Sequence, residues 1–240
     1  MIEKTRGIVL RNTNYRDNSV ISHVYTQEFG IQSYMLNGVR NQKGAIRPSH
    51  LMPLNLLDLV VYKKPTSSIQ RIKELRCNPI LTTIHFDVLK NSIALFIAEI
   101  LNASLSEEEP NPELFQFLEH FIHILDLEDD KIANYPIYFL IHLTRYLGFF
   151  PKGTYADQQV FNLKEGMFVD NVYLNTDCVD SDYSEWWWTM LNSSLDEWTS
   201  RYIDRDIRNN LLNQLLLYYE HHGLHGRKIK SHKVLREVLR

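Results

Sequence analysis

The first eighty residues carry the hydrophobic pattern of short β-strands. Apolar and β-branched residues gather into runs that turn-forming residues separate. The expected strands are residues 7–10, 19–26, 31–36, 54–62 and 69–76. Gly30 suits the positive φ that a tight connection needs between the second and third of them. Five strands at this spacing predict a small closed barrel.

From residue 81 the pattern changes to the three- and four-residue spacing of amphipathic helices. In the first helix the apolar positions are Phe86, Leu89, Ile93, Phe96, Ile97, Ile100 and Leu101. Asn111 and Pro112 predict the N-cap and first position of a second helix. Further helices are expected at 134–147, 184–195 and 203–222, with a small hairpin at 160–163 and 169–174.

The expected fold class is therefore α+β, with a β-barrel followed by an α-helical domain. We place the barrel at residues 1–80 and the helical domain at 81–240. Within the helical domain, residues 151–183 form an irregular insertion and 227–240 form a basic end. The longest apolar runs are too short to cross a bilayer, and the first residues lack the apolar core of a signal peptide. Two distant cysteines, Cys77 and Cys178, indicate a reducing, cytoplasmic setting without disulfides.

Charge is distributed unevenly along the chain, although the net charge of the whole is only −3. Residues 1–80 hold twelve Lys or Arg and five Asp or Glu, a net charge of +7. Residues 227–240 hold six basic groups and one acid, or +5, which leaves −15 on residues 81–226. Cations at both ends of an acidic body indicate a protein that meets a polyanion with selected surfaces.

Small five-stranded barrels often bind single-stranded nucleic acid with cations for phosphates and aromatic rings for bases. The candidate DNA-binding cations are Arg11, Arg16, Arg40, Lys43, Arg47, Lys63, Lys64 and Arg71, with Arg227, Lys228 and Lys230 in the basic end. The interleaved aromatic residues are Tyr15, Tyr25, Phe29, Tyr34 and Tyr62, and packing in the barrel core is the favoured role for these. Solvated surface charge is the alternative for the cations, and a disordered tail is the alternative for the basic end.

Two other clusters in the helical part have both a structural and a binding interpretation. Arg145, Phe149 and Phe150 could hold a short acidic–aromatic peptide, or the rings could fill a domain junction. Trp186, Trp187 and Trp188 point in three directions on a helix, so core packing is expected for one or two of them.

Catalytic and metal-binding motifs are missing from the sequence. It contains no phosphate-binding glycine loop, nucleophile elbow or dinucleotide fingerprint. His221 and His225 have helical spacing, but Gly223 lies between them, and surface histidines explain them better than a metal site. We expect no cofactor, no metal and no enzymatic activity. The alternatives are a protein-interaction scaffold and a metal-dependent nuclease that uses these histidines with acids of the helical body.

Several segments, in order along the chain, resemble the bacterial RecO family of DNA repair and recombination mediators. They are residues 5–11 (TRGIVLR), 15–20 (YRDNSV), 25–30 (YTQEFG), 37–40 (NGVR), 146–151 (YLGFFP) and 226–231 (GRKIKS). The resemblance implies an N-terminal OB-fold, binding of single- and double-stranded DNA, and annealing of complementary strands. It also implies partnership with RecR and with the C-terminal tail of the single-stranded DNA-binding protein SSB, and help in loading RecA. The setting that it implies is the bacterial cytoplasm, at the nucleoid.

The chain departs from many members of that family at one place. They carry four zinc-binding cysteines in the insertion, whereas residues 151–180 hold only Cys178, with Tyr155, Asp157 and Phe168 where thiolates would be expected. One thiolate cannot complete a tetrahedral zinc site. The sequence resembles the zinc-less branch found among Bacteroidetes-type bacteria. We expect an insertion held by apolar side chains, namely Phe161, Leu163, Phe168, Val169 and Tyr173.

Overall fold

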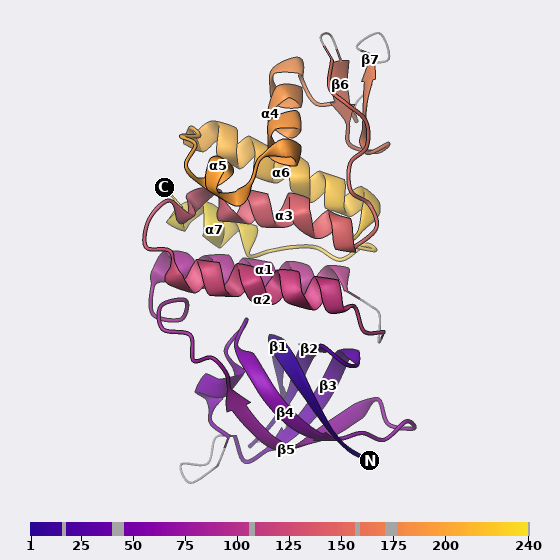
Figure 1. Cartoon of the computed structure of the whole chain (residues 1–240), viewed down its shortest axis with the longest axis vertical. Coiled ribbons are helices and arrows are strands. Elements are labelled where there is room, and N and C mark those ends of the chain that lie inside the picture. Colours follow the sequence, from indigo (N-terminus) through magenta and orange to yellow (C-terminus); the bar gives the residue numbers. More distant parts are fainter. Residues whose placement is uncertain (16–17, 40–45, 106–108, 157–158, 171–176, 240) are drawn as a thin grey trace. The chain divides into compact units, whose positions relative to one another are not determined.

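A computed structural model describes residues 1–15, 18–39, 46–105, 109–156, 159–170 and 177–239 (Figure 1). It has the expected α+β architecture, a closed barrel followed by helices and a small two-stranded sheet. The chain divides into two compact units, Met1–Leu127 and Glu128–Arg240. Residue 80, where we expect a domain boundary from the sequence, falls inside the first unit. Among the described residues, no helix is both long enough and apolar enough to cross a bilayer.

Five strands close the barrel in the order β1-β2-β3-β5-β4, which is the strand order of an OB-fold. They are β1 (Ile2–Tyr15), β2 (Ser19–Thr26), β3 (Gly30–Asn37), β4 (Leu56–Tyr62) and β5 (Ile69–Cys77). Neighbouring strands are antiparallel except β3 and β5, which pair in parallel from Ser33–Ile69 to Met35–Arg71. Strand β1 begins earlier and ends later than the sequence predicts, because it pairs with β4 along its first half and with β2 along its second.

Alternate residues of the strands fill the barrel interior, as the period of two requires. Val9, Val24, Tyr34 and Leu59 are almost completely buried in this core. Tyr25 is also buried, but its ring lies on the outer face of β2 and stacks on Phe115 of the helical segment with centroids 6.2 Å apart. Gly7 lies so close to Val24 that a Cβ atom there would stand 2.6 Å from the Val24 side chain. Gly30 has φ of 60° and begins β3, as its place in the turn predicts. The expected role in the barrel core is therefore correct for Tyr34, whereas Tyr25 is buried outside the barrel.

Helices α1 (Val88–Ser104) and α2 (Pro112–Leu127) belong to the first unit. The Asn111 side chain accepts a hydrogen bond from the Leu114 N–H at 3.0 Å, which confirms the expected N-cap of α2. The expectation that Phe86 lies in the buried stripe of the first helix is wrong, because 83% of Phe86 is exposed. The Asp87 side chain caps α1 by accepting the Lys90 N–H, so the helix begins after Phe86.

One carboxylate fixes the segment that leads from the barrel to α1. Asp126, near the end of α2, accepts hydrogen bonds from the backbone N–H groups of Thr82, Thr83 and Ile84 at 2.8–3.1 Å. The buried Lys90 ammonium donates to the Thr83 hydroxyl at 2.7 Å and to the Asp126 carbonyl at 3.0 Å. These bonds satisfy backbone groups that strand or helix pairing leaves without partners.

The second unit is helical and carries the two-stranded sheet (Figure 1). Its elements are η2 (Ile132–Asn134), α3 (Tyr135–Tyr146), β6 (Gln159–Asn162), β7 (Met167–Asp170), α4 (Ser181–Asn192), α5 (Leu195–Thr199), α6 (Arg205–His222) and α7 (His232–Val238). The sheet is the small hairpin that the sequence predicts, with β7 starting two residues earlier and ending at Asp170 in the described part.

Aromatic side chains hold this hairpin against the helices. The Phe161 ring stacks on Trp187 with centroids 4.2 Å apart and contacts Phe168 edge-on at 5.1 Å. Trp187 is completely buried, whereas Trp186 and Trp188 are partly buried. Leu163 and Phe168 are buried and Val169 is half-buried, while Tyr173 and Asp157 lie outside the described residues. The apolar contacts expected for this insertion are present at the described positions.

The basic end includes a helix, α7, that apolar periodicity does not reveal, so the alternative of a disordered tail is not supported. Residues 227–239 contain five large apolar side chains, and three of them, Ile229, Leu235 and Leu239, are buried. The Arg208 guanidinium donates a hydrogen bond to the Leu239 carbonyl at 2.9 Å. A helix of seven residues is too short to show its period clearly, and packing within the unit stabilises it.

Candidate nucleic-acid interface

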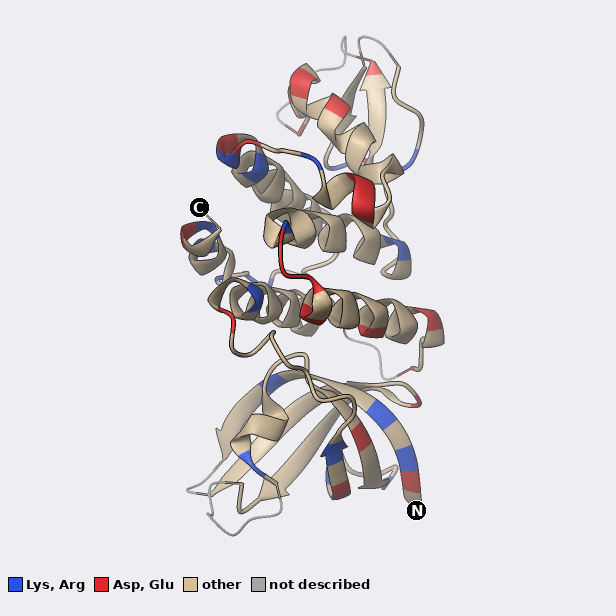
Figure 2. Cartoon of the chain, turned by 60° about the vertical axis from the view of Figure 1, so that its left-hand side comes forward, with Lys and Arg blue, Asp and Glu red and all other residues tan. Residues whose placement is uncertain are grey.

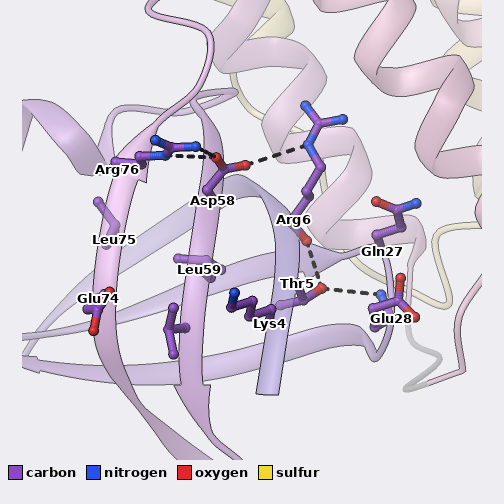
Figure 3. A pocket seen from close by; sticks show the side chains of 11 residues that line it. Lys4, Thr5, Arg6, Gln27, Glu28, Asp58, Leu59, Glu74, Leu75 and Arg76 are labelled. Carbon is purple, nitrogen blue, oxygen red and sulfur yellow. Dashed lines mark hydrogen bonds and ion pairs between the residues drawn. The ribbon is translucent and has the colours of Figure 1, made fainter. Parts of the chain in front are cut away.

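One side of the barrel, formed by β1, β4 and β5, carries cations that carboxylates already neutralise. The Asp58 carboxylate is 2.7 Å from the Arg76 guanidinium and 3.8 Å from that of Arg6 (Figure 3). Arg6 also pairs with Glu119 of α2, and Lys73 pairs with Glu74 at 3.4 Å. The cross-strand register explains this arrangement, because Arg6, Asp58 and Arg76 lie opposite one another on three neighbouring strands.

The pKa of Asp58 follows from these partners. Partial burial would raise the pKa of this carboxyl, but hydrogen bonds from Asn78 and Arg76 and the charges of Arg76 and Arg6 outweigh it. The resulting pKa is below the ordinary value of 3.8, so Asp58 is ionised at neutral pH. Its negative charge remains among the cations of this side.

A hollow of about 590 Å³ lies on the same side of the barrel (Figure 3). Three basic and three acidic residues line it together with neutral ones: Lys4, Thr5, Arg6, Gln27, Glu28, Asp58, Leu59, Val60, Glu74, Leu75 and Arg76. The charges balance, so this hollow offers a polyanion no net attraction. Size alone therefore does not identify the nucleic-acid interface.

The opposite side of the barrel has a different character. Strands β2 and β3 contain no Lys, Arg, Asp or Glu. In Figure 2, the strand that begins at the N-terminus carries blue and red segments, whereas most of the remaining barrel ribbon is tan. Arg11 of β1 lies opposite His23 of β2, and Arg71 of β5 lies opposite Met35 of β3. These two arginines therefore flank a neutral ribbon of two strands.

Most of the candidate cations around this ribbon are exposed. Arg11, Arg47, Lys64 and Arg71 are exposed and Lys63 is half-buried. Among the residues that the structure describes, none of the five forms an ion pair with Asp or Glu. Their positive charge is therefore available to an external anion. Arg16, Arg40 and Lys43 lie outside the described residues.

His23 adds a hydrogen-bonding group to this side and no charge at neutral pH. Its Nδ1 lies 3.3 Å from the Ser33 hydroxyl on the next strand. Burial lowers the pKa of His23 below 6.5, and the neighbouring Arg11 charge lowers it further. The imidazole is therefore neutral at pH 7.

Of the remaining aromatic candidates, Phe29 contacts a lysine, whereas Tyr15 and Tyr62 are exposed. The Lys63 ammonium lies 3.5 Å from the centroid of the Phe29 ring, a cation–π contact. Tyr15 and Tyr62 are 41% and 40% exposed at the ends of β1 and β4. Exposed tyrosines on a barrel with free cations can stack on nucleic-acid bases.

A second hollow, of about 440 Å³, lies beside the loop between β4 and β5. It is lined by Ile31, Gln32, Ser33, Lys63, Lys64, Pro65, Thr66, Ser67, Ser68 and Gln70. Two lysines, hydroxyl groups and amides surround it, and none of its lining residues is acidic. Lys63 and Lys64 are among the cations that the sequence predicts to bind DNA, whereas the sequence does not predict a role for Gln70. The sequence signal for a special role is that Gln70 is polar but lies on the same face of β5 as the apolar Ile72, two residues later.

The cations of the basic end belong to the second unit. Arg227, Lys228 and Lys230 are exposed, whereas Ile229 between them is buried. The alternation presents all three charged side chains to solvent from one short segment.

Arg145, Phe149 and Phe150 have unequal surroundings. The Phe149 ring packs between Tyr219 at 5.3 Å, Tyr218 at 5.8 Å and His222 at 5.8 Å, so it fills the space between α3 and α6. The exposed Arg145 guanidinium lies 4.1 Å above the half-buried Phe150 ring. A cation and the ring beneath it remain accessible at the end of α3.

The described residues provide no group of three His, Cys, Asp or Glu side chains that could hold a metal ion. His221 and His225 are both exposed, and His222 between them is 2.9 Å from the Leu163 carbonyl. The Cys178 sulfur accepts a hydrogen bond from the Asn162 amide at 3.6 Å. Among the described residues, the surroundings of Cys178 therefore do not form the four-ligand zinc site that the family resemblance implies for other members.

Comparison with known proteins gives similarity in both units. Residues 1–79 match the family model "Recombination protein O N terminal", and residues 85–161 match "Recombination protein O C terminal". The chain is 34% identical over 239 residues to the DNA repair protein RecO of Christiangramia forsetii, with 99% of each chain covered. It is 33% identical over 239 residues to that of Azobacteroides pseudotrichonymphae, again with 99% of each chain covered. Identity to that of Flavobacterium psychrophilum is 30% over 236 residues, 98% of each chain.

Proposed function

We propose a function from the premise that this chain belongs to the RecO family of DNA repair and recombination proteins. It binds single- and double-stranded DNA without sequence specificity and anneals complementary strands. It also helps to load RecA on single strands that SSB covers. No catalytic step or cofactor is needed for these activities. The protein acts in the bacterial cytoplasm, at the nucleoid.

The single observation that supports DNA binding best is the separation of charges on the barrel. Arg6, Lys73 and Arg76 are paired with carboxylates on one side. Arg11 and Arg71 flank the neutral strands β2 and β3 on the other. A polyanion gains by replacing its counterions with unpaired cations and gains little from cations that already have partners.

Annealing follows from the same electrostatics. Two DNA strands repel each other through their phosphates, and that repulsion is a large part of the barrier to pairing. A surface that neutralises phosphates lowers this barrier for any sequence, since phosphate contacts carry no base information. Neutral strands between the cations leave room for bases without imposing base-edge readout.

Two protein partners complete the proposal. RecR is the first. The second is the acidic C-terminal tail of SSB, for which Arg145 and Phe150 are the accessible candidates and Phe149 forms the supporting wall. A guanidinium can hold a carboxylate while the ring beneath it contacts an apolar side chain.

A binding experiment separates this proposal from the rival of a protein scaffold with incidental DNA contact. We expect Arg11→Gln/Arg71→Gln to weaken binding about tenfold or more for two unrelated oligonucleotides alike. The slope of log K against log salt should fall by roughly 1.5, because two phosphate contacts are lost. Gel shifts at several salt concentrations provide the measurement.

The matched control is Lys73→Gln/Arg76→Gln, which removes the same charge from the side where both cations are paired. It should change affinity and slope much less. Equal effects of the two double variants, or an affinity of the unmodified protein that does not change with salt, would reject the proposed interface. An effect on only one oligonucleotide would indicate base readout.

A further inference from the structure

The loop between β4 and β5 is held in one conformation by a single buried amide. Gln70 is only 7% exposed, and its side chain turns back into the loop. The Gln70 Oε1 accepts the Lys64 N–H at 2.9 Å, and its Nε2 donates to the Lys64 carbonyl at 2.9 Å and to the Ser67 carbonyl at 2.6 Å. Both backbone polar groups of Lys64 are thus fixed by one side chain.

The loop's own sequence supports the same conformation. The Ser67 N–H donates to the Lys64 carbonyl at 3.1 Å, which closes a four-residue turn with Pro65 at its second position. Proline favours that position because its φ is already close to the required value. The Ser67 hydroxyl donates to the Ile69 carbonyl at 2.7 Å. The loop needs little further ordering when a ligand arrives.

The two lysines at the start of the loop lie in different environments. The Lys63 ammonium rests over the Phe29 ring, which restricts its direction. Lys64 is exposed, although its backbone is fixed by Gln70. Both line the second hollow, where hydroxyl groups and amides are the other polar neighbours and carboxylates are missing from the lining.

We infer that this hollow is a preformed oxyanion site that takes one backbone phosphate of bound DNA, and that Gln70 is its positioning residue. The inference rests on the proposed function. Lysines and hydroxyl groups donate to phosphate oxygens, and a charged acceptor strengthens each bond. Preorganisation adds affinity, since the entropy of ordering the loop is lost on folding and not on binding.

The surroundings favour nucleic acid over an acidic protein segment as the source of the anion. Arg71 follows Gln70 directly on β5, and Arg11 lies on the far side of the neutral strands β2 and β3. The site therefore continues into a row of separated cations. A phosphate chain, with charges repeated at each nucleotide, fits such a row.

The test measures coupling between Gln70 and Lys64 in the full chain. Gln70→Met keeps the length of the side chain and removes its hydrogen bonds, and Lys64→Gln removes the charge. We expect each to weaken binding of a short single-stranded oligonucleotide about three- to tenfold in filter binding. The double variant should bind no more weakly than Lys64→Gln alone, because a positioning residue has no effect without the group that it positions.

Salt dependence separates the two roles. Lys64→Gln should reduce the slope of log K against log salt by roughly 0.7 to 0.9, whereas Gln70→Met should leave it closer to that of the unmodified protein. Gln27→Met, in the charge-balanced hollow, is the matched control and should bind normally. Effects of Gln70→Met and Lys64→Gln that multiply in the double variant, or normal binding by either single variant, would overturn the inference.

A second measurement distinguishes failure of this inference from failure of the proposed function. Inorganic phosphate should shift the amide NMR signals of Thr66, Ser67 and Ser68 in the unmodified protein and shift them less in Gln70→Met. Shifts without DNA binding would reject the proposed function and leave the site intact. DNA binding without phosphate shifts would reject the site alone. A response to an acidic peptide but not to phosphate would also reject it.

Discussion

Asp126 shows how one side chain can determine the path of a segment. Its pKa lies below the ordinary value of 3.8: burial would raise it, but hydrogen bonds from Thr82, Thr83 and Ile84 outweigh burial. A carboxyl whose pKa is lower in the folded state stabilises that state above its unfolded pKa. The stabilisation is lost as the pH falls through the lower, folded value.

We expect Asp126→Ala to lower the free energy of unfolding by about 3 kcal/mol at pH 7, because buried N–H groups lose a charged acceptor. Urea unfolding followed by far-ultraviolet circular dichroism measures this loss. The difference from the unmodified protein should shrink as the pH falls below 3.8, because the unfolded state takes up a proton there while the folded carboxyl keeps its charge down to its lower pKa. Asp129→Ala, at an exposed position, is the control. A difference that stays constant down to pH 3 would contradict this account.

Residue-scale roles are the part of the structure that the sequence predicts least. Asn111 could be predicted as an N-cap because capping depends on residues three positions apart. Asp126 and Gln70 act differently: Asp126 binds residues more than forty positions away, and Gln70 binds a loop that reads locally as a turn. Phe86 fits the helical period of the apolar residues, but it lies outside α1 because Asp87 is the N-cap at which that helix begins.

At the scale of elements, the hairpin β6–β7 is packed against the helices by aromatic side chains. Phe161 contacts both Trp187 and Phe168, and Trp188 approaches Phe168 edge-on at 6.0 Å. The Trp187 indole also donates a hydrogen bond to Gln214 of α6 at 2.8 Å. Stacked and edge-on rings each add to the stabilisation that their burial gives.

We expect Phe161→Ala to destabilise the protein by about 3 to 5 kcal/mol, the usual range for removing a buried aromatic ring. EDTA should leave the thermal midpoint of the unmodified protein unchanged. Calorimetric melting curves provide both measurements. Phe150→Ala, where the ring is half-buried and outside the cluster, should cost much less. A clear loss of stability in EDTA would mean that a metal contributes to the fold.

The sequence predicts the existence and type of most elements, because their apolar periods are long enough to read. The five strands and the longer helices lie close to their expected places. Helix α7 could not be expected, since its seven residues carry few apolar side chains and its stability comes from burial of Leu235 and Leu239. Strand β1 extends beyond its apolar run because pairing with two neighbours stabilises its polar ends.

At the scale of the whole molecule, the two ends of the sequence are basic, and residues 81–226 between them carry a net charge of −15. The barrel's cations lie in the first unit, and those of the basic end lie in the second. An OB-fold covers roughly 4 to 16 nucleotides, so a longer strand is needed for both units to contact DNA at once. Oligonucleotide length is therefore a direct way to separate their contributions.

We expect Lys228→Gln/Lys230→Gln to weaken binding of an oligonucleotide of about 50 nucleotides several-fold and to leave one of about 10 unaffected. Gel shifts at fixed salt measure both. Lys152→Gln/Lys164→Gln removes two exposed lysines elsewhere in the same unit and should have little effect on either. Equal weakening for both lengths would contradict separate contacts by the two units.

The net charge of residues 1–80 predicts that the barrel binds an anion, but it does not predict which cations are paired with carboxylates. The +7 of residues 1–80 includes Arg6 and Arg76, whose shared partner Asp58 becomes their neighbour only in the folded barrel. Strand pairing places Asp58 between two arginines, whereas Arg11 and Arg71 have no acidic partner within the described part of the chain. That distinction depends on which charged residues face one another across strands that are far apart in the sequence.

The tryptophans are distributed in a way that has an experimental consequence. All four lie between residues 186 and 198, within the second unit, and the barrel has none. Intrinsic indole emission is therefore a reporter for the second unit alone. Emission and circular dichroism will give coincident denaturation curves only if the two units lose structure together. Quenching of that emission by added DNA would indicate contact outside the barrel.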